Sequence, residues 1–437
     1  MGDGAGFLSK AFPASPSSAV DSDQLNPRPA SSRLPPVVKS LGAVSFLNDL
    51  ASEMVYPLLP ALVTRVLGGG ALTLGVLDGA ADASAALAKL WSGWVADTRG
   101  WRRPLVVLGY AVAAVARPLT ALAGAGWQVV ALRVADRLGK GMRTPPRDAV
   151  IADATAPEIR GRAFGFHRTM DHAGAMVGPL VATALLTLAG LSPSAVIAWA
   201  AVPSAFAVMV AWVALRREKA VADPDARGPE PRPSAADVSG RPPSPSLAPP
   251  RPPSSLLALV VVFAFARLPE TLFILRLQDL GVAIGLIPMI WALLHVVRTA
   301  ASYPGGWLSD RAGPGPAMLV GWLLYGMVCV GLARAGSAVV GMAWFLVFGL
   351  VAGATESAER ALIAGVSGPA RRGRAFGAYH AVVGVAALPG GVLFGLVYSR
   401  VSGTAALLAS AALAGAIVLG ALMLGRQGGR VGRTPSP

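Results

Sequence analysis

The sequence predicts an all-α membrane protein with twelve transmembrane helices, arranged as two six-helix bundles in a parallel repeat. Three observations predict this fold: apolar segments recur along the chain, charged residues are few, and motifs of the first half return in the second. Of the 437 residues, 54% are hydrophobic and 14% are charged, and the mean hydropathy is +0.57. Soluble domains contain about 25% charged residues, so the composition favours a chain that spans a bilayer.

Twelve apolar segments follow one another, each near the length of about 20 residues that crosses the hydrocarbon core. The first six cover residues 39–66, 71–96, 104–123, 127–150, 162–187 and 194–215. The second six cover residues 255–279, 282–307, 316–334, 337–364, 374–400 and 403–424. The two sets define the expected bundles, 39–215 and 255–424.

The remaining parts of the chain are expected to lie outside the bundles. Residues 1–38 and 425–437 are expected to be tails, the first of them disordered. Residues 216–254 are rich in Pro, Ser and charge, so they are expected to form a linker. The linker is therefore expected to be dispensable for the fold.

Basic residues are distributed unequally between the two ends of the predicted spans. With the N-terminus placed inside, the cytoplasmic ends hold fourteen Lys or Arg, whereas the outer ends hold Arg65, Arg276, Arg334 and Arg400. By the positive-inside rule, both termini and the linker are cytoplasmic. We therefore expect a multi-pass protein of the bacterial cytoplasmic (inner) membrane, and the net charge of +15 requires no nucleic-acid partner.

Two pairs of motifs recur at nearly the same offset in the two halves. The stretch "SGWVADTRG" at 92–100 matches "GGWLSDRAG" at 305–313, and "RGRAFG" occurs at both 160–165 and 372–377. Each pair occupies the same place in its half, after the second span or at the start of the fifth. The halves are therefore expected to be parallel structural repeats.

Charged residues also separate the spans into two groups. The sixth, ninth and twelfth spans have uncharged interiors, and the third carries only Arg117. Charged side chains inside a membrane face protein or water. We therefore expect the third, sixth, ninth and twelfth spans to face lipid, and the other eight to surround a polar cavity.

The loop after the second span resembles a signature of the major facilitator superfamily (MFS) of transporters. The matching residues are Gly93, Asp97, Gly100, Arg102 and Arg103, and a partial second copy gives Gly306, Asp310 and Arg311. The resemblance implies that this loop holds the two halves together on the cytoplasmic side. Glu356 and Glu359 in the tenth span are also expected near the cytoplasmic side. One interpretation is that they form a gate of salt bridges.

Two further motifs are similar to MFS signatures. Arg137 and Gly141 match a motif of the fourth span, and Gly174, Gly178 and Pro179 match the antiporter motif of the fifth, in which Ala182 replaces the last Gly. The resemblance covers residues 39–424. It implies secondary transport by alternating access, and the fifth-span motif implies an antiporter with a conformational hinge there. Arg137 is expected either to bind a substrate anion or to tune an acid.

The stretch "SFLNDLASEMVYPLLPALV" places two carboxylates inside the first span. Asp49, Glu53 and Tyr56 recur at three- or four-residue spacing, so they share one helix face. Neighbouring acids repel each other, so one of them is expected to hold a proton near neutral pH. Pro57 and Pro60 are expected to bend the helix. This face predicts a proton-coupling or cation-handling site; the alternative is an ion pair with a basic residue that joins the halves.

Acidic residues of the second span correspond to basic residues of the eighth. Asp78 and Asp82 lie one turn apart, and at the repeat offset of 213 Asp82 corresponds to His295, with Arg298 close to one turn further on. These residues predict either an interface of opposite charges between the halves or a bipolar substrate site.

Two more pairs of ionisable residues are expected to interact. His167 and Asp171 in the fifth span are spaced i, i+4 and form a His–carboxylate pair that can relay protons. Arg267 and Glu270 in the seventh span are expected to pair with each other. A metal site is not expected, because His167 and His172 are five residues apart, which is a poor spacing for one helix face.

These observations predict secondary transport of a small organic solute, coupled to protons and directed outward. The expected partners are the solute, protons and the lipid bilayer, and the protein is expected to act as a monomer without a cofactor. The sequence contains no Gly-x-x-x-x-Gly-Lys-Ser/Thr loop, so ATP is not the expected energy source. The alternatives are an organic-anion symporter or facilitator that uses buried Arg residues and, more remotely, a membrane-embedded enzyme or receptor.

Overall fold

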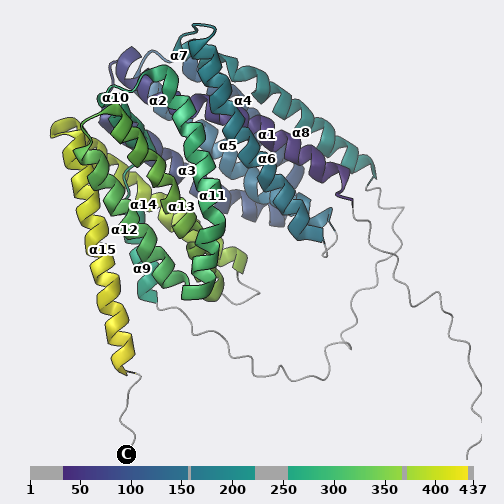
Figure 1. Cartoon of the computed structure of the whole chain (residues 1–437). Helices are drawn as coiled ribbons and strands as arrows, with labels where there is room; N and C mark the ends of the chain where they lie inside the picture. Colours follow the sequence, from purple (N-terminus) through teal and green to yellow (C-terminus); the bar gives the residue numbers. More distant parts are fainter. Residues whose placement is uncertain (1–32, 156–158, 222–253, 367–371, 432–437) are drawn as a thin grey trace, which may run out of the picture.

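The computed structural model of the protein describes residues 33–155, 159–221, 254–366 and 372–431. In these ranges every regular element is a helix, and the helices form two adjacent groups that follow the order of the chain (Figure 1). The predicted all-α fold is confirmed, because each of the twelve predicted spans coincides with one helix or with consecutive helical segments.

The first bundle contains six spanning segments. They are α1 (Pro36–Val55) with its continuation to residue 66, α3 (Ala71–Arg99), α4 (Arg102–Leu119), α5 (Gly126–Asp153), α6 (Arg160–Thr187), and the pair α7 (Pro193–Trp199) and α8 (Ala201–Val221). The last helix therefore extends past the predicted bundle boundary at residue 215 into the predicted linker.

The second bundle repeats this arrangement. Its segments are the pair α9 (Ser254–Ala266) and α10 (Glu270–Asp279), then α11 (Ile287–Ala312), α12 (Pro314–Arg334), α13 (Ala338–Val366), α14 (Arg372–Arg400) and α15 (Gly403–Val431). The last helix again runs beyond the predicted boundary, here residue 424, into the predicted tail.

Nine helical segments in the described part of the chain are long and apolar enough to cross a membrane. The segments that begin with α1, α5 and α6 fall outside this group, and each carries charged residues within its length, such as Asp49, Arg137 and Asp171. These helices are the least suited to lipid, so their charged faces must be covered by protein or water.

The first span loses its regular α-helical pattern at Pro57 and Pro60, where the sequence predicts a bend. After α1 ends at Val55, a 3₁₀ turn covers Tyr56–Leu58 (η2), a short helix covers Leu59–Ala61 (α2), and a wider helical turn covers Leu62–Val66 (η3). Pro57 and Pro60 have no backbone N–H, so neither can donate the usual i to i−4 hydrogen bond. The irregular segment thus begins at Tyr56, one turn beyond Glu53.

The two bundles meet along α3 and α14, and also along α6 and α11. At Gly75 and Gly391 the backbones of α3 and α14 touch, and a Cβ on either residue would overlap the carbonyl oxygen of the other. At the end of the molecule where α3 begins and α14 ends, the backbone N–H of Leu72 donates a hydrogen bond of 3.0 Å to Ser399 Oγ. Contacts between the bundles therefore close this end of the molecule.

A Gly391→Val substitution is expected to separate α3 from α14 and to shift the protein away from this closed conformation. The measurement is thiol labelling of a cysteine placed at Ala71, which is 5% exposed and packs against Gly395 of α14 at the closed end. Labelling is expected to rise several-fold over the parent with the cysteine alone. Background labelling is small because the native Cys329 is buried.

The matched control for this experiment is Gly415→Val. Gly415 lies in α15, and a Cβ there would meet no other atom within 4 Å. Equal labelling of the two variants would show that the close approach of α3 and α14 does not stabilise the closed end.

Candidate functional site

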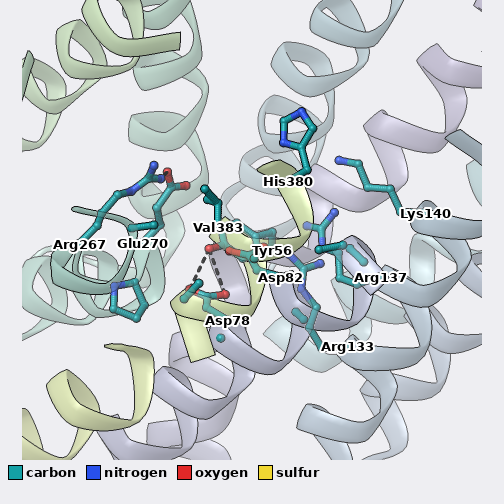
Figure 2. Close-up of a pocket in the computed structure, with 18 of the residues that line it drawn as sticks. Tyr56, Asp78, Asp82, Arg133, Arg137, Lys140, Arg267, Glu270, His380 and Val383 are labelled. Carbon is teal, nitrogen blue, oxygen red and sulfur yellow. Dashed lines mark hydrogen bonds and ion pairs between the residues drawn. The ribbon is translucent and has the colours of Figure 1, made fainter. Parts of the chain in front are cut away.

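A cavity of about 420 Å³ lies between the two bundles (Figure 2). The residues that line it come from α1, η2, α3 and α5 of the first bundle and from α9, α10, α11, α14 and the 267–269 turn of the second. Among the described residues, α4, α8, α12 and α15 contribute none, as predicted for helices that face lipid. Contrary to the prediction that eight spans surround the cavity, α6 contributes none either, and α13 lines a smaller adjacent cavity of about 110 Å³.

Most of the predicted substrate and coupling residues line this central cavity. They are Glu53, Tyr56, Asp78, Asp82, Arg137, His295 and Arg298. Asp49, His167 and Asp171 are not part of its lining. In the described part of the chain, no group of three His, Cys, Asp or Glu side chains could hold a metal ion.

Asp78 of α3 accepts hydrogen bonds from both bundles. The Tyr56 hydroxyl donates to its two oxygens at 3.2 and 3.1 Å, which Figure 2 shows as dashed lines. From the second bundle, the backbone N–H and the hydroxyl of Thr271 donate to Oδ2 at 3.1 and 2.8 Å. Thr271 lies in the first turn of α10, where N–H groups have no partner within the helix. Asp78 therefore caps the N-terminus of a helix in the opposite bundle, a favourable place for a negative charge.

Glu53 of α1 makes the second contact of this kind. The indole N–H of Trp291 in α11 donates to Glu53 Oε2 at 2.8 Å, and His295 Nε2 lies 3.8 Å from the same oxygen. Trp291 also contacts Tyr56, with 5.1 Å between the ring centroids. The repeat offset paired Asp82 with His295, whereas in the structure the carboxylate beside His295 is that of Glu53. The contact between the halves at His295 therefore involves Glu53 and not Asp82, and an interface of opposite charges stays a prediction.

Glu270, the first residue of α10, holds two arginine side chains. Arg267 donates to Oε1 at 2.9 Å, and Arg298 donates to the same oxygen at 2.6 Å. The predicted Arg267–Glu270 pair is confirmed. Arg298 pairs within its own bundle, and among the described residues it forms no ion pair with an acid of the first bundle.

The α5 helix presents a basic face to the cavity. Arg133, Arg137 and Lys140 are spaced i, i+4 and i+7, and all three line the cavity on the side opposite to Arg267 and Glu270 (Figure 2). The guanidinium carbon of Arg133 lies 4.5 Å from the ring centroid of Tyr56. This wall can attract an anionic group.

A buried network joins α1, α4 and α5 beneath this face. Arg117 Nε donates to Asp136 Oδ1 at 2.9 Å, and its two terminal nitrogens donate to the carbonyl and side-chain oxygens of Asn48, each at 3.0 Å. The Arg117 and Asp136 side chains are 4% and 3% exposed. Arg133 and Arg137 approach Asp136 at 3.3 and 3.9 Å. Although α4 was predicted to face lipid, its Arg117 therefore points into the bundle.

The other predicted proton-handling residues lie within the first bundle, away from the cavity. The side-chain amide of Asn48 donates to Asp49 Oδ1 at 2.8 Å. His167 is buried, with Nε2 3.1 Å from Ser45 Oγ and 3.7 Å from Asp171 Oδ1. The His167–Asp171 pair is thus brought together as predicted, but between α1 and α6. Its role as a proton relay stays a prediction.

The predicted cytoplasmic loop begins where α3 ends. Gly100 follows α3 with φ of 65°, and Gly313 follows α11 with φ of 89°, a region that favours glycine. Both loops therefore begin at a glycine with positive φ, although ψ is 18° at Gly100 and 161° at Gly313. Arg102 pairs with Asp153 at the end of α5. The side chain of Asp97 lies outside the described residues, so the proposed contact between the halves stays a prediction.

The second copy of this motif lies at the end of α11. Asp310 and Arg311 are exposed there, and the guanidinium carbon of Arg311 lies 5.2 Å from the ring centroid of Trp307. Gly306 is half-buried. The second copy of the motif therefore lies at the end of α11, as the first copy lies at the end of α3.

The predicted gate residues Glu356 and Glu359 line the smaller cavity beside the central one. The hydroxyl of Tyr379 in α14 donates to Glu359 Oε2 at 2.9 Å, which joins α13 to α14. This contact lies within the second bundle. A gate between the two bundles at these residues stays a prediction.

The glycines of the fifth-span motif pack α6 against α1. A Cβ at Gly174 would overlap the carbonyl oxygen of Phe46, and one at Gly178 would overlap that of Leu50. Pro179 is buried inside α6. The motif therefore produces close helix packing inside the first bundle, and a hinge at this position stays a prediction.

Several residues of the site were not assigned from the sequence, among them Trp291, Thr271, Lys89, Arg133 and Lys140. Trp291 lies one turn before His295 on the same face of α11, so its position relative to a predicted residue could have revealed it. Thr271 acts partly through its backbone N–H, which leaves no signal in the sequence. Lys89 lines the cavity two turns beyond Asp82.

Comparison with known proteins agrees with this architecture. The model of the Major Facilitator Superfamily matches residues 41–338. An uncharacterized MFS-type transporter of Methanocaldococcus jannaschii is 28% identical over 364 residues, which cover 82% of this chain and 87% of that protein. The multidrug resistance protein MdtH of Photorhabdus laumondii is 31% identical over 153 residues, which cover 34% of this chain and 38% of MdtH.

Solved structures share the fold at low sequence identity. The crystal structure of the nucleoside transporter NupG has a TM-score of 0.67 at 13% identity, covering 89% of this chain and 99% of NupG. A bacterial homolog to the human lysosomal transporter Spinster, inward-facing and occupied, has a TM-score of 0.65 at 15% identity, covering 92% and 98%. Because the family model matches residues 41–338, the chain belongs to the major facilitator superfamily: it is a multi-pass membrane protein for secondary transport, not an enzyme.

Proposed function

We propose that the protein exports a small organic solute in exchange for protons, by alternating access, and that the central cavity holds the solute. One observation carries this proposal: two carboxylates in the cavity wall, Glu53 and Asp78, accept hydrogen bonds from the opposite bundle. A protonated carboxyl is a weaker acceptor than a carboxylate. Proton binding at either residue therefore changes the relative free energies of the two conformations, which is the requirement for coupling.

The proposed orientation makes this conformation the one that faces the cytoplasm. The positive-inside rule places the chain termini in the cytoplasm, so the closed end with Leu72 and Ser399 is the outer end. The contact between Thr271 and Asp78 lies on the same side of the cavity. Lys89 and Lys140, further along α3 and α5 toward the cytoplasmic ends, then lie nearer the opening.

Two observations support export over uptake. Gly174, Gly178 and Pro179 match most of the antiporter motif of the fifth span. The relative MdtH, which aligns with a third of this chain, is named for multidrug resistance. Both features favour a transporter that moves a solute out of the cell against an inward flow of protons.

The test is transport by the purified full-length protein in proteoliposomes, with a mixed panel of metabolites and drugs. We expect counterflow of at least one solute without a pH gradient, and accumulation of that solute when a gradient is imposed. A protonophore should remove the accumulation and leave counterflow unchanged. Counterflow that does not respond to the gradient, with no proton movement on solute addition, would instead identify a facilitator.

A further inference from the structure

We infer that the solute carries an anionic group, a carboxylate or a phosphate, which binds the basic face of α5 formed by Arg133, Arg137 and Lys140, together with Lys89 of α3. This inference deepens the proposed function and rests on it for the identity of the cavity as the transport site. The juxtaposition that carries it is a half-open cavity with surplus basic groups on one wall.

Basic side chains outnumber acidic ones in the cavity lining. The basic residues are Lys89, Arg133, Arg137, Lys140, Arg267 and Arg298, and the acidic residues are Glu53, Asp78, Asp82 and Glu270. A cavity within a membrane tolerates unbalanced charge where water or a ligand supplies the compensation. When a coupling carboxylate takes up a proton, the positive excess becomes larger.

Three of the four acids already have hydrogen-bond donors. Glu53 accepts from Trp291, Asp78 accepts from Thr271, and Glu270 accepts from two arginines. A cationic solute would have to share these carboxylates with donors that already neutralise part of their charge. Asp82 is the remaining acid, and a single carboxylate among six basic residues does not make a cation site.

The basic face has the opposite character. In the described part of the chain, the ammonium groups of Lys89 and Lys140 have no hydrogen-bond or ion-pair partner. The carboxylate oxygen nearest to Arg137 belongs to Asp136 and lies 3.9 Å from Arg137 Nε. Asp136 is already shared with Arg117 and Arg133. These cations therefore retain bonding capacity that an anion can use.

Arg133 adds a buried donor to this face. Its side chain is 7% exposed, and its Nε has no hydrogen-bond partner among the described residues. Leaving a buried charged donor unsatisfied is costly, so an anion bound by the Arg133 guanidinium would offset that cost. Arg137 and Lys140 follow along the same helix face toward the opening, where they line the path of an entering anion (Figure 2).

The chemistry of the face fits carboxylates and phosphates. A guanidinium group binds two oxygens of one anion in a fork, and ammonium groups add point charges that accept several geometries. The cavity volume of about 420 Å³ lies within the usual range for small-molecule sites. A small organic anion with one apolar or hydroxylated part fits both the charge and the size.

The test measures binding to the purified full-length protein at fixed ionic strength and without a pH gradient. The probes are glutarate, citrate and glycerol 3-phosphate as anions, and putrescine and tetraethylammonium as cations. We expect at least one anion to raise the thermal unfolding midpoint in a saturable manner, and neither cation to do so. The preferred probe then distinguishes carboxylate from phosphate recognition.

The variants Arg137→Gln and Lys140→Gln are each expected to weaken the binding of that anion by about tenfold or more, the usual cost of losing a charged hydrogen bond. Arg400→Gln is the matched control, because Arg400 is exposed at the closed end of α14 and does not line the cavity. It should bind the anion as the parent does. Lys140 is exposed to the cavity, so its replacement should not affect folding; the unfolding midpoint without ligand checks this.

Three outcomes would overturn the inference: saturable binding of a cation with none of an anion, no binding of any probe anion, or equal anion affinity in the Lys140→Gln and Arg400→Gln variants. Failure of the proposed function looks different. In that case the anion binds through the basic face, while the reconstituted protein shows no response to a pH gradient.

Discussion

Replacing Glu53 by Gln is expected to abolish the accumulation of substrate in response to a pH gradient, while substrate exchange continues. Gln keeps the size of the side chain and an oxygen that accepts from Trp291, but it cannot bind or release a proton. Exchange of substrate for substrate needs no net movement of protons. The measurement is transport in proteoliposomes, with imposed gradients and exchange assayed on the same preparation.

The control for this prediction is Asp49→Asn, the same kind of change one turn along α1. Asp49 accepts from its neighbour Asn48 and does not line the cavity, so pH-dependent accumulation should persist in this variant. If Glu53→Gln also accumulates substrate in response to pH, Glu53 is not the coupling residue. Asp78, the other acid that joins the bundles, then becomes the next candidate.

The Asp136→Asn substitution is expected to destabilise the protein more than any other single neutralisation in the cavity region. Asp136 lies against Arg117, Arg133 and Arg137, and its side chain is 3% exposed. Removing one partner of a buried ion pair leaves an uncompensated charge and costs about 3–5 kcal/mol. The measurements are the abundance of the protein in the membrane and the thermal unfolding midpoint after purification.

Asp82→Asn is the matched control for this second prediction. Asp82 lies in the cavity wall of α3 and is exposed to the cavity, so its neutralisation should leave the unfolding midpoint close to that of the parent. Similar midpoints for the two variants would mean that the network around Arg117 contributes little to stability. Replacing Arg117 by Gln in the Asp136→Asn background should then recover nothing, whereas the prediction expects partial recovery.

Most of the fold could be predicted because its signals are local. Apolar segments and positive charges at one end follow from the bilayer as solvent. The recurrence of "RGRAFG" indicates a repeat and can be read from the sequence alone. Even the irregular helix after Val55 could be expected from Pro57 and Pro60. Where helices ended was less predictable, because α8 continues into charged sequence and α15 continues past Gly428 and Gly429.

The sequence indicated which residues belong to the candidate site, but not which residues they contact. Glu53, Asp78 and His295 could be identified because a charge within an apolar span is unusual. Their partners come from residues 193 and 238 positions away, as in Thr271 with Asp78 and Trp291 with Glu53. Such contacts depend on how the two bundles meet, which no local pattern encodes. The third span was expected to face lipid, but its Arg117 pairs with Asp136 on a neighbouring helix of the same bundle, and this contact has no local sequence pattern either.

The closed end of the cavity has an electrical consequence. A hydrated cavity conducts ions, so in the proposed orientation the membrane voltage falls mainly across the thin closed layer between Glu53 and the outer surface. The free energy of a proton that crosses this layer changes by about 2.3 kcal/mol for every 100 mV of membrane voltage. A solute that enters from the open side crosses little of the field. Proton release from Glu53 to the cytoplasm and solute binding from the cytoplasm should therefore depend little on voltage, whereas the conformational change that carries the charge of Glu53 past the closed layer should depend on it.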